Sequence, residues 1–311
     1  MLILDALVPV FMVIMVGTLF HFVRFPGGDF WPLVERFTYF FLFPAMLVSK
    51  MANAKIDQVA VDKIALAIIL LLVAMTTLVV VLKPLLTKSG PAFTSIYQGG
   101  LRFNTYVVLA AAEALYGESG LTTAAVAMAI MIPLINVFCV CIFAVYVGQS
   151  GSGILATLKA LVKNPLIVGC VVGMLLNVTG IGLPGWSAAA FSIVSNAALP
   201  LGLLAVGFAL NLSAIKEASW PLISSSLLKL MVMPVVATLI GYYVGLSEIE
   251  IGVLLLFAAM PTATSSYILA RQLGGHAPLM AAITTAQTLL AMITLPIVLQ
   301  LLPNTLLRLL G

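Results

Sequence analysis

A proline and several hydroxyls interrupt a stretch of the chain that is otherwise apolar. Residues 258–266 read Ala-Ala-Met-Pro-Thr-Ala-Thr-Ser-Ser, and the apolar run around them is long enough to cross a bilayer. Pro261 has no backbone donor and clashes with the preceding turn, so carbonyl groups near Ala258 should lose their helical partners. Because lipid cannot satisfy such groups, a break at membrane depth indicates buried protein or a water-filled cavity beside it. Pro261 and Thr262 are therefore candidate binding residues.

A second polar interruption occupies residues 102–106, which read Arg-Phe-Asn-Thr-Tyr. The amide of Asn104 can donate and accept hydrogen bonds, Thr105 adds a hydroxyl, and Arg102 could pair bidentately with an anion. Arg102 could equally extend to the membrane interface, and Asn104 could form a plain interhelical bond. Half-helices that begin near both breaks would present positive N-termini to a carboxylate. Opposed half-helix ends near the bilayer midplane are typical of secondary transporters.

Two further ionisable residues lie inside apolar stretches, where a charge is costly and indicates function. Glu113 follows Thr105 by eight residues, about 12 Å along a helix, which is far for contact with the same ligand. A protonatable carboxyl there could instead couple proton movement. We expect Lys229 to pair with Glu113 or with a freed carbonyl. Asn136 and Gln287 are buried amides for which we expect interhelical bonds.

The composition identifies an integral membrane protein that contacts the lipid bilayer. Hydrophobic residues make up 63% of the chain and charged residues 8%, against roughly 25% charged in soluble domains. The net charge of +4 is small and scattered, which excludes nucleic-acid binding and fits Lys and Arg in cytoplasmic loops. We predict no metal and no cofactor, because the three cysteines lie in apolar runs and the Cys139-x-Cys141 spacing has no His nearby.

The elements that must position these residues are about ten transmembrane helices in an all-α fold, since one crossing needs about 20 apolar residues. Positive-inside bias places both termini on the extracytoplasmic side. The predicted spans are 2–23, 33–52, 61–83, 92–116, 121–148, 164–182, 187–212, 218–245, 248–273 and 277–302.

The chain divides into two halves at a Gly- and Ser-rich linker, which we place at 149–163 between a first five-helix repeat, 1–148, and a second, 164–311. Because each half has an odd number of spans, the second runs with inverted topology, as in many secondary transporters. The two halves also share residues at one constant difference in residue number: Pro9, Gly17, Leu19, Pro44 and Leu47 recur as Pro165, Gly173, Leu175, Pro200 and Leu203. The same difference aligns Asn104 with Met260.

Five short motifs resemble the auxin efflux carrier family: Leu42-Phe43-Pro44, Phe103-Asn104-Thr105, Ile132-Pro133-Leu134-Ile135-Asn136, Ala198-Leu199-Pro200-Leu201 and Met260-Pro261. The likeness covers nearly the whole chain. It implies ten helices in two inverted repeats, with helices 1, 2, 6 and 7 as a scaffold and helices 3–5 and 8–10 as a transport core. It also implies crossed, broken helices 4 and 9 and an elevator-like motion.

The resemblance further implies a small organic anion as substrate. Bacterial relatives are associated with malate, malonate and similar carboxylates, and plant relatives export auxin, itself a carboxylate. The chain lacks the long central cytoplasmic loop of many plant members, so it is closer to the bacterial type, which implies the inner membrane.

Matching prolines occupy the predicted scaffold. Pro44 and Pro200 could each shape a kinked surface or contact substrate, and Asn196 could satisfy the carbonyl freed by Pro200 or reach the substrate. The spacing Gly169-x-x-x-Gly173 permits close helix approach, within one chain or between two copies in a homodimer.

Other functions on the same fold remain open. A bile-acid-type symporter coupled to sodium is the nearest alternative, although residues 251–271 contain no acid or amide to bind the ion. A receptor that binds the ligand without moving it is another, and an inverted repeat suits alternating access better than a channel. An enzyme is disfavoured, because no HExxH motif and no acidic cluster is present.

Overall fold

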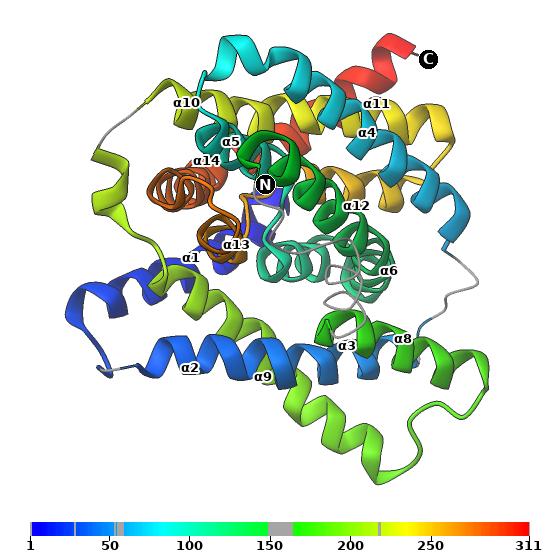
Figure 1. The fold of residues 1–311 in the computed structure, drawn as a ribbon. Coiled ribbons are helices and arrows are strands. Elements are labelled where there is room, and N and C mark those ends of the chain that lie inside the picture. Colours follow the sequence, from blue (N-terminus) through cyan, green and yellow to red (C-terminus); the bar gives the residue numbers. More distant parts are fainter. Residues whose placement is uncertain are drawn as a thin grey trace.

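The computed structural model describes residues 2–27, 29–52, 54, 59–148, 164–216 and 219–310, and every regular element within these ranges is a helix. Figure 1 shows their arrangement. The predicted linker at 149–163 lies outside the described residues. The first half contains α1 (Leu2–Val23), α2 (Phe30–Phe37), η1 (Thr38–Leu42), α3 (Phe43–Ala52), α4 (Val61–Leu86), α5 (Gly90–Leu101) and α6 (Thr105–Val147). The second contains α8 (Pro165–Val178), α9 (Trp186–Phe208), η3 (Leu212–Lys216), α10 (Trp220–Leu227), η4 (Leu228–Val232), α11 (Met233–Val244), α12 (Glu248–Ala259), α13 (Ser265–Gln272) and α14 (Ala277–Leu310).

The chain is an all-α, multi-pass membrane protein. Among the described residues, six helices are long and apolar enough to cross a bilayer, rather than the ten predicted. The difference arises where helices are interrupted or merged. The stretch Gly90–Val147 has 58 residues, too many for one crossing of about 20, and it breaks at 102–104 and again at Gly117, whose φ is 62°. The predicted span 248–273 is split between α12 and α13.

Two π-helical turns precede prolines. In η1 the N–H of Phe43 bonds to the carbonyl of Thr38, and in η4 the N–H of Met233 bonds to that of Leu228. Proline cannot donate to the turn before it, so the helix widens locally ahead of Pro44 in α3 and ahead of the proline in α11. Each π turn thereby redirects the side chains that it carries.

The helices α1, α2, α3, α8 and α9 form one layer, seen at the bottom of Figure 1. Within it α1 packs on α9, and α3 packs on α8. Glycines make these contacts close: a β-carbon on Gly17 would overlap the carbonyl oxygen of Leu204, and one on Gly169 would lie 2.9 Å from the Cα of Pro44. The Gly169-x-x-x-Gly173 pair therefore packs against α3 within the chain.

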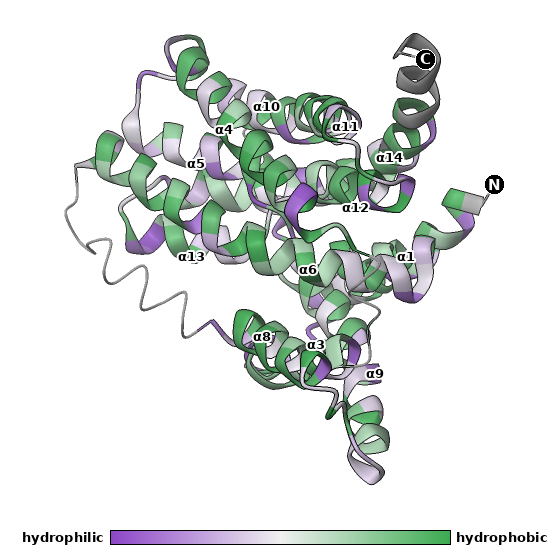
Figure 2. Ribbon diagram, turned by 90° about the vertical axis from the view of Figure 1, so that its right-hand side faces the viewer, coloured by the Kyte–Doolittle hydropathy of each residue, from purple (hydrophilic) through white to green (hydrophobic). Residues whose placement is uncertain are grey.

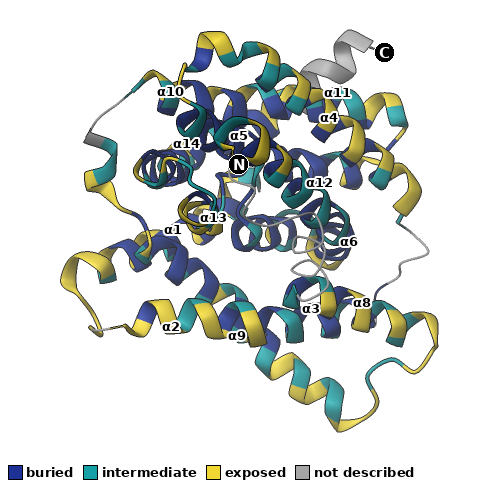
Figure 3. Ribbon diagram, in the orientation of Figure 1, coloured by how far each residue is buried: buried dark blue, intermediate teal, exposed yellow. Residues whose placement is uncertain are grey.

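The remaining helices form the larger body above this layer, with α5 and α12 at its interior. Figure 3 shows these two helices in the buried class over most of their length, and α5 is buried from Ala92 to Leu101. Much of the ribbon is coloured as hydrophobic in Figure 2. Large apolar side chains are exposed on both parts of the molecule, including Leu85 of α4 at 73% and Trp186 of α9 at 85%, which fits contact with lipid.

Candidate functional site

Two helix breaks touch inside the fold. Residues 102–104 separate α5 from α6, and residues 260–264 separate α12 from α13. The backbone N–H of Asn104 donates to the carbonyl oxygen of Pro261 at 2.8 Å, so the two non-helical segments are directly bonded. The sequence predicted both breaks, and the structure contains both.

A lysine satisfies the carbonyl groups that the breaks leave free. Pro261 cannot donate to the carbonyl of Phe257, which instead accepts from Lys229 Nζ at 2.9 Å. The same ammonium lies 3.4 Å from the carbonyl oxygen of Leu101, the last residue of α5. Of the two partners predicted for Lys229, the freed carbonyl is confirmed. Glu113 is paired elsewhere.

A glutamine bridges the two breaks from α14. Gln287 Oε1 accepts from the backbone N–H of Thr262 at 3.0 Å, and its Nε2 donates to the carbonyl of Gly99 at 2.9 Å. The predicted interhelical bond of Gln287 is thus confirmed. Thr262 is fully buried, and its hydroxyl bonds to the carbonyl of Gln98 at 3.4 Å. These bonds hold α5, α14 and the 260–264 segment in one fixed arrangement.

The two half-helices that leave the crossing differ at their N-termini. Asn104 caps α6, because its Oδ1 accepts from the backbone N–H groups of Tyr106 and Val107 at 3.1 and 3.4 Å. Among the described residues, none accepts a hydrogen bond from Asn104 Nδ2. No side chain caps α13: the hydroxyl of Thr264 donates instead to Glu35 Oε1 at 2.9 Å.

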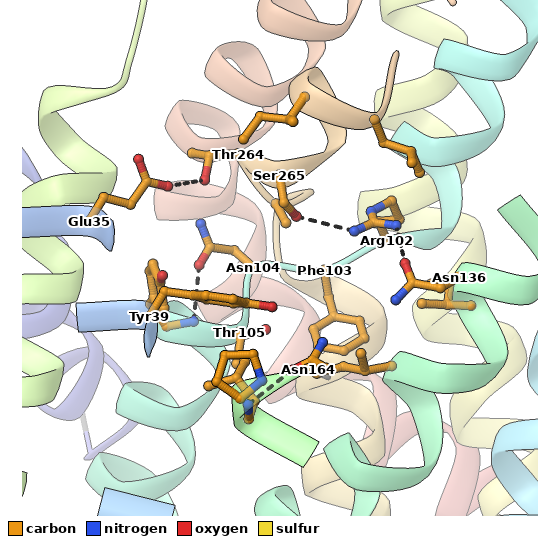
Figure 4. Close-up of a pocket in the computed structure, with 18 of the residues that line it drawn as sticks. Glu35, Tyr39, Arg102, Phe103, Asn104, Thr105, Asn136, Asn164, Thr264 and Ser265 are labelled. Atoms are coloured by element: carbon orange, nitrogen blue, oxygen red, sulfur yellow. Dashed lines mark hydrogen bonds between the residues drawn. The ribbon is translucent and has the colours of Figure 1, made fainter. Parts of the chain in front are cut away.

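A cavity of about 800 Å³ lies against this crossing, within the range of roughly 300–1,000 Å³ common for small-molecule sites. Its walls come from α2 and η1, the 102–106 segment, the middle of α6, the start of α8, and α13 (Figure 4). The polar lining residues labelled there are Glu35, Tyr39, Arg102, Asn104, Thr105, Asn136, Asn164, Thr264 and Ser265.

Arg102 is a cation of the crossing that lines the cavity, and its side chain is held in place by neutral groups. Its guanidinium donates to Asn136 Oδ1 at 2.8 Å and to Ser265 Oγ at 3.1 Å. The charged residues that line the cavity are Glu35, Arg36 and Arg102, so the wall carries a net positive charge. In the part of the chain that the structure describes, no three His, Cys, Asp or Glu side chains gather where a metal could bind.

The predicted binding residues separate into two groups. Asn104, Thr105 and Arg102 line the cavity, whereas Pro261 and Thr262 lie in the crossing and do not. Their backbone groups and the Thr262 hydroxyl order the break.

The other candidates lie away from this cavity. Glu113 forms an ion pair with Lys50 of α3 at 3.3 Å, and both side chains are partly exposed. Pro44 packs beside Gly169. Asn196 and Pro200 are exposed on α9, and neither of them lines the cavity.

Sequence reasoning missed several lining residues. Glu35 and Tyr39 come from the start of the second span, and Asn164 directly precedes α8. An acidic residue within an apolar span was a usable signal for Glu35. Nothing local marked Tyr39 or Asn164, because tertiary packing alone brings them to the crossing.

The comparison with known families agrees with this architecture. Residues 152–299 match the family model described as membrane transport protein. The matched residues make up just under half of the chain, and the match supports an auxin efflux carrier family transporter. Together with the apolar helices, it supports a membrane transporter. No curated protein matches the chain.

Proposed function

We propose that this auxin efflux carrier family member is a secondary active transporter of small organic anions, namely carboxylates such as malate, malonate or auxin-like acids. The observation that carries the proposal is Arg102, a cavity-lining cation whose hydrogen-bond partners, Asn136 and Ser265, are neutral. The ion pair between Lys50 and Glu113 is the one found among the described residues, so Arg102 has no carboxylate partner there. A cation without a counter-ion in a partly buried cavity favours an anionic ligand.

The helix ends at the crossing support the same ligand class. Thr105 and Ser265, the first residues of α6 and α13, both line the cavity. Each helix N-terminus is equivalent to about half a positive charge, so the two together add roughly one charge to that of Arg102. The Nδ2 group of Asn104 supplies a further donor, and the uncapped start of α13 leaves room for a carboxylate oxygen.

The helix order supports ten membrane crossings in two repeats, 1–148 and 164–311. We assign the crossings to α1, α2 with α3, α4, α5 with the start of α6, the rest of α6, α8, α9, α10 with α11, α12 with α13, and α14. The two broken crossings each begin with a helix of 12 residues. An inverted relation is supported by Gly17, which packs on Leu204, while its counterpart Gly173 packs on Val48, the counterpart of Leu204.

An elevator-type motion would move α4–α6 and α10–α14 as a transport core against a scaffold of α1–α3, α8 and α9. The cavity has walls from both groups, as the alternating-access proposal requires. Among the described residues, two pairs of polar side chains join the groups, Thr264 with Glu35 and Glu113 with Lys50, and the Cys170 thiol also donates to the carbonyl of Ala125. Sliding of the core would break these contacts, which makes them candidate indicators of the conformational state.

We further propose that the protein lies in a bacterial inner membrane with both termini extracytoplasmic. This orientation places the loops before α2, before α8 and after α13 in the cytoplasm, following the Lys and Arg bias. The cavity wall includes Pro32, Asn164 and Leu273, which lie beside those loops. In this proposed orientation the cavity would open toward the cytoplasm.

Counterflow in proteoliposomes tests the function. Vesicles preloaded with unlabelled carboxylate would receive radiolabelled malate or malonate, and intact protein would be compared with Arg102→Gln at equal incorporation. A lost hydrogen bond to a charged group costs about 1.5–3 kcal/mol, so we expect roughly a 10- to 100-fold higher half-saturation concentration. Arg271→Gln is the matched control, because Arg271 is exposed on α13 and does not line the cavity.

The outcomes also separate the alternatives. Exchange that requires sodium would favour a symporter of the bile-acid type, whereas exchange that responds to a pH gradient would favour proton coupling. Saturable binding without exchange would favour a receptor on this fold. Exchange with the same half-saturation concentration in Arg102→Gln would remove Arg102 from the binding site.

A further inference from the structure

Among the described residues, Lys229 is a fully buried lysine that forms no ion pair with a carboxylate. It lies in the π-helical turn η4, and its side chain has an exposed fraction of 0%. Its Nζ contacts two backbone carbonyl oxygens, of Phe257 at 2.9 Å and Leu101 at 3.4 Å, and the sulfur of Met233 at 3.3 Å. The partners of this amine are thus two backbone carbonyl oxygens and one thioether sulfur.

Those carbonyls belong to the C-terminal ends of two different half-helices. Leu101 is the last residue of α5, and Phe257 lies in the last turn of α12. A helix C-terminus is equivalent to about −0.5 charge, so the two ends together carry roughly one negative charge. One ammonium balances that charge. A peptide oxygen cluster of this kind is also the ligand set that an alkali cation prefers, because such hard cations bind oxygen.

We propose that the convergence of α5 and α12 is a monovalent-cation site which the chain fills with its own cation, the ammonium of Lys229. The side chain takes the place of a bound alkali ion, so the crossing needs no cation from solution to hold its two helix ends together. The proposal concerns the crossing alone and does not depend on which substrate is carried.

The sequence around Lys229 fits this role. Lys229 lies in the π turn that precedes the proline of α11, and its neighbours in the chain, Leu228 and Leu230, are also buried. Removing the side chain beyond Cβ would leave a dry, carbonyl-lined space, and small cations could enter it. A neutral hydrogen-bond donor at the same place would satisfy one carbonyl but would leave the charge of the helix ends unbalanced.

The test is thermal unfolding of purified Lys229→Ala in detergent, with N-methylglucamine chloride, NaCl, KCl or n-propylammonium chloride at equal ionic strength. The n-propylammonium ion reproduces the deleted atoms. We expect a lowered unfolding temperature in N-methylglucamine and a saturable rise of about 5 °C or more with at least one small cation, as for a ligand that binds only the folded state. The intact protein should shift by less than about 1 °C between these salts, because its site is filled.

Two variants provide controls. Lys63→Ala removes an exposed lysine whose Nζ also bonds to a carbonyl at a helix end, that of Gly245 at 3.0 Å, and it should gain no cation dependence. Lys229→Gln keeps a neutral donor. If Lys229→Gln were as stable as the intact protein in N-methylglucamine, a neutral hydrogen bond would suffice and the proposal would be wrong. A Lys229→Ala protein equally stable, or equally unstable, in every salt would also overturn it. None of these results depends on carboxylate exchange.

Discussion

Replacing Asn104 with aspartate should separate its capping role from its binding role. Aspartate keeps an oxygen that can accept from the N–H groups of Tyr106 and Val107, and Asn and Asp are similar N-caps, so stability should change by less than about 0.5 kcal/mol. The variant loses the Nδ2 donor and adds a negative charge to the cavity wall. Losing one hydrogen bond to a carboxylate costs about 1.5–3 kcal/mol, so the half-saturation concentration should rise roughly 10- to 100-fold.

Asn104→Ala removes both roles, so it should lose about 1 kcal/mol of stability as well as affinity. The measurements are thermal unfolding in detergent and carboxylate counterflow at equal incorporation. Ser247→Ala is the control for capping alone: Ser247 caps α12 through a capping box and does not line the cavity, so stability should fall while exchange persists. An Asn104→Asp protein that exchanges carboxylate with unchanged half-saturation would refute the assignment of Nδ2 to the substrate.

Two further predictions concern Gln287 at the crossing and the ion pair between Glu113 and Lys50. Gln287→Leu should lower the unfolding temperature, because it leaves the N–H of Thr262 and the carbonyl of Gly99 unpaired at about 1–3 kcal/mol each; Gln287→Glu, which keeps the acceptor, should lose less. Glu113→Gln should leave stability within about 1 kcal/mol, since its ion pair is partly exposed, but should speed counterflow up to about fivefold by removing a contact between scaffold and core. If this variant instead lost its response to a pH gradient at unchanged speed, Glu113 would be a coupling residue rather than a tether.

Both breaks could be predicted from the sequence because their causes are local. Pro261 removes a donor wherever it stands, and a run of polar residues in an apolar span marks the break at Asn104. The capping of α6 by Asn104 was not predicted, because its amide was assigned to the substrate or to an interhelical bond. The same reasoning predicted that a carbonyl would be freed and that Lys229 could satisfy it. These features follow from backbone chemistry within one or two turns of helix.

Residues that reach the site through packing could not be predicted in this way. Glu35 meets Thr264 across the cavity, and Asn164 enters it from the start of α8, although both lie far from the crossing in the sequence. Asn136 was expected to form an interhelical bond, and it does, but its partner Arg102 makes it part of the cavity wall. Such placements depend on how whole helices pack, which local patterns do not encode.

The crossing brings together four helix ends whose partial charges would otherwise cancel. The C-terminal ends of α5 and α12 contribute about −1 in total and the N-terminal ends of α6 and α13 about +1, so the bare backbone offers an anion almost no net attraction. Lys229 neutralises the negative ends from within the protein, and it does so without lining the cavity. What remains at the cavity is the positive pair of N-termini beside Arg102. On this argument, loss of the Lys229 charge should weaken anion binding even though the ammonium does not touch the substrate, and a cation restored to the crossing should strengthen it again.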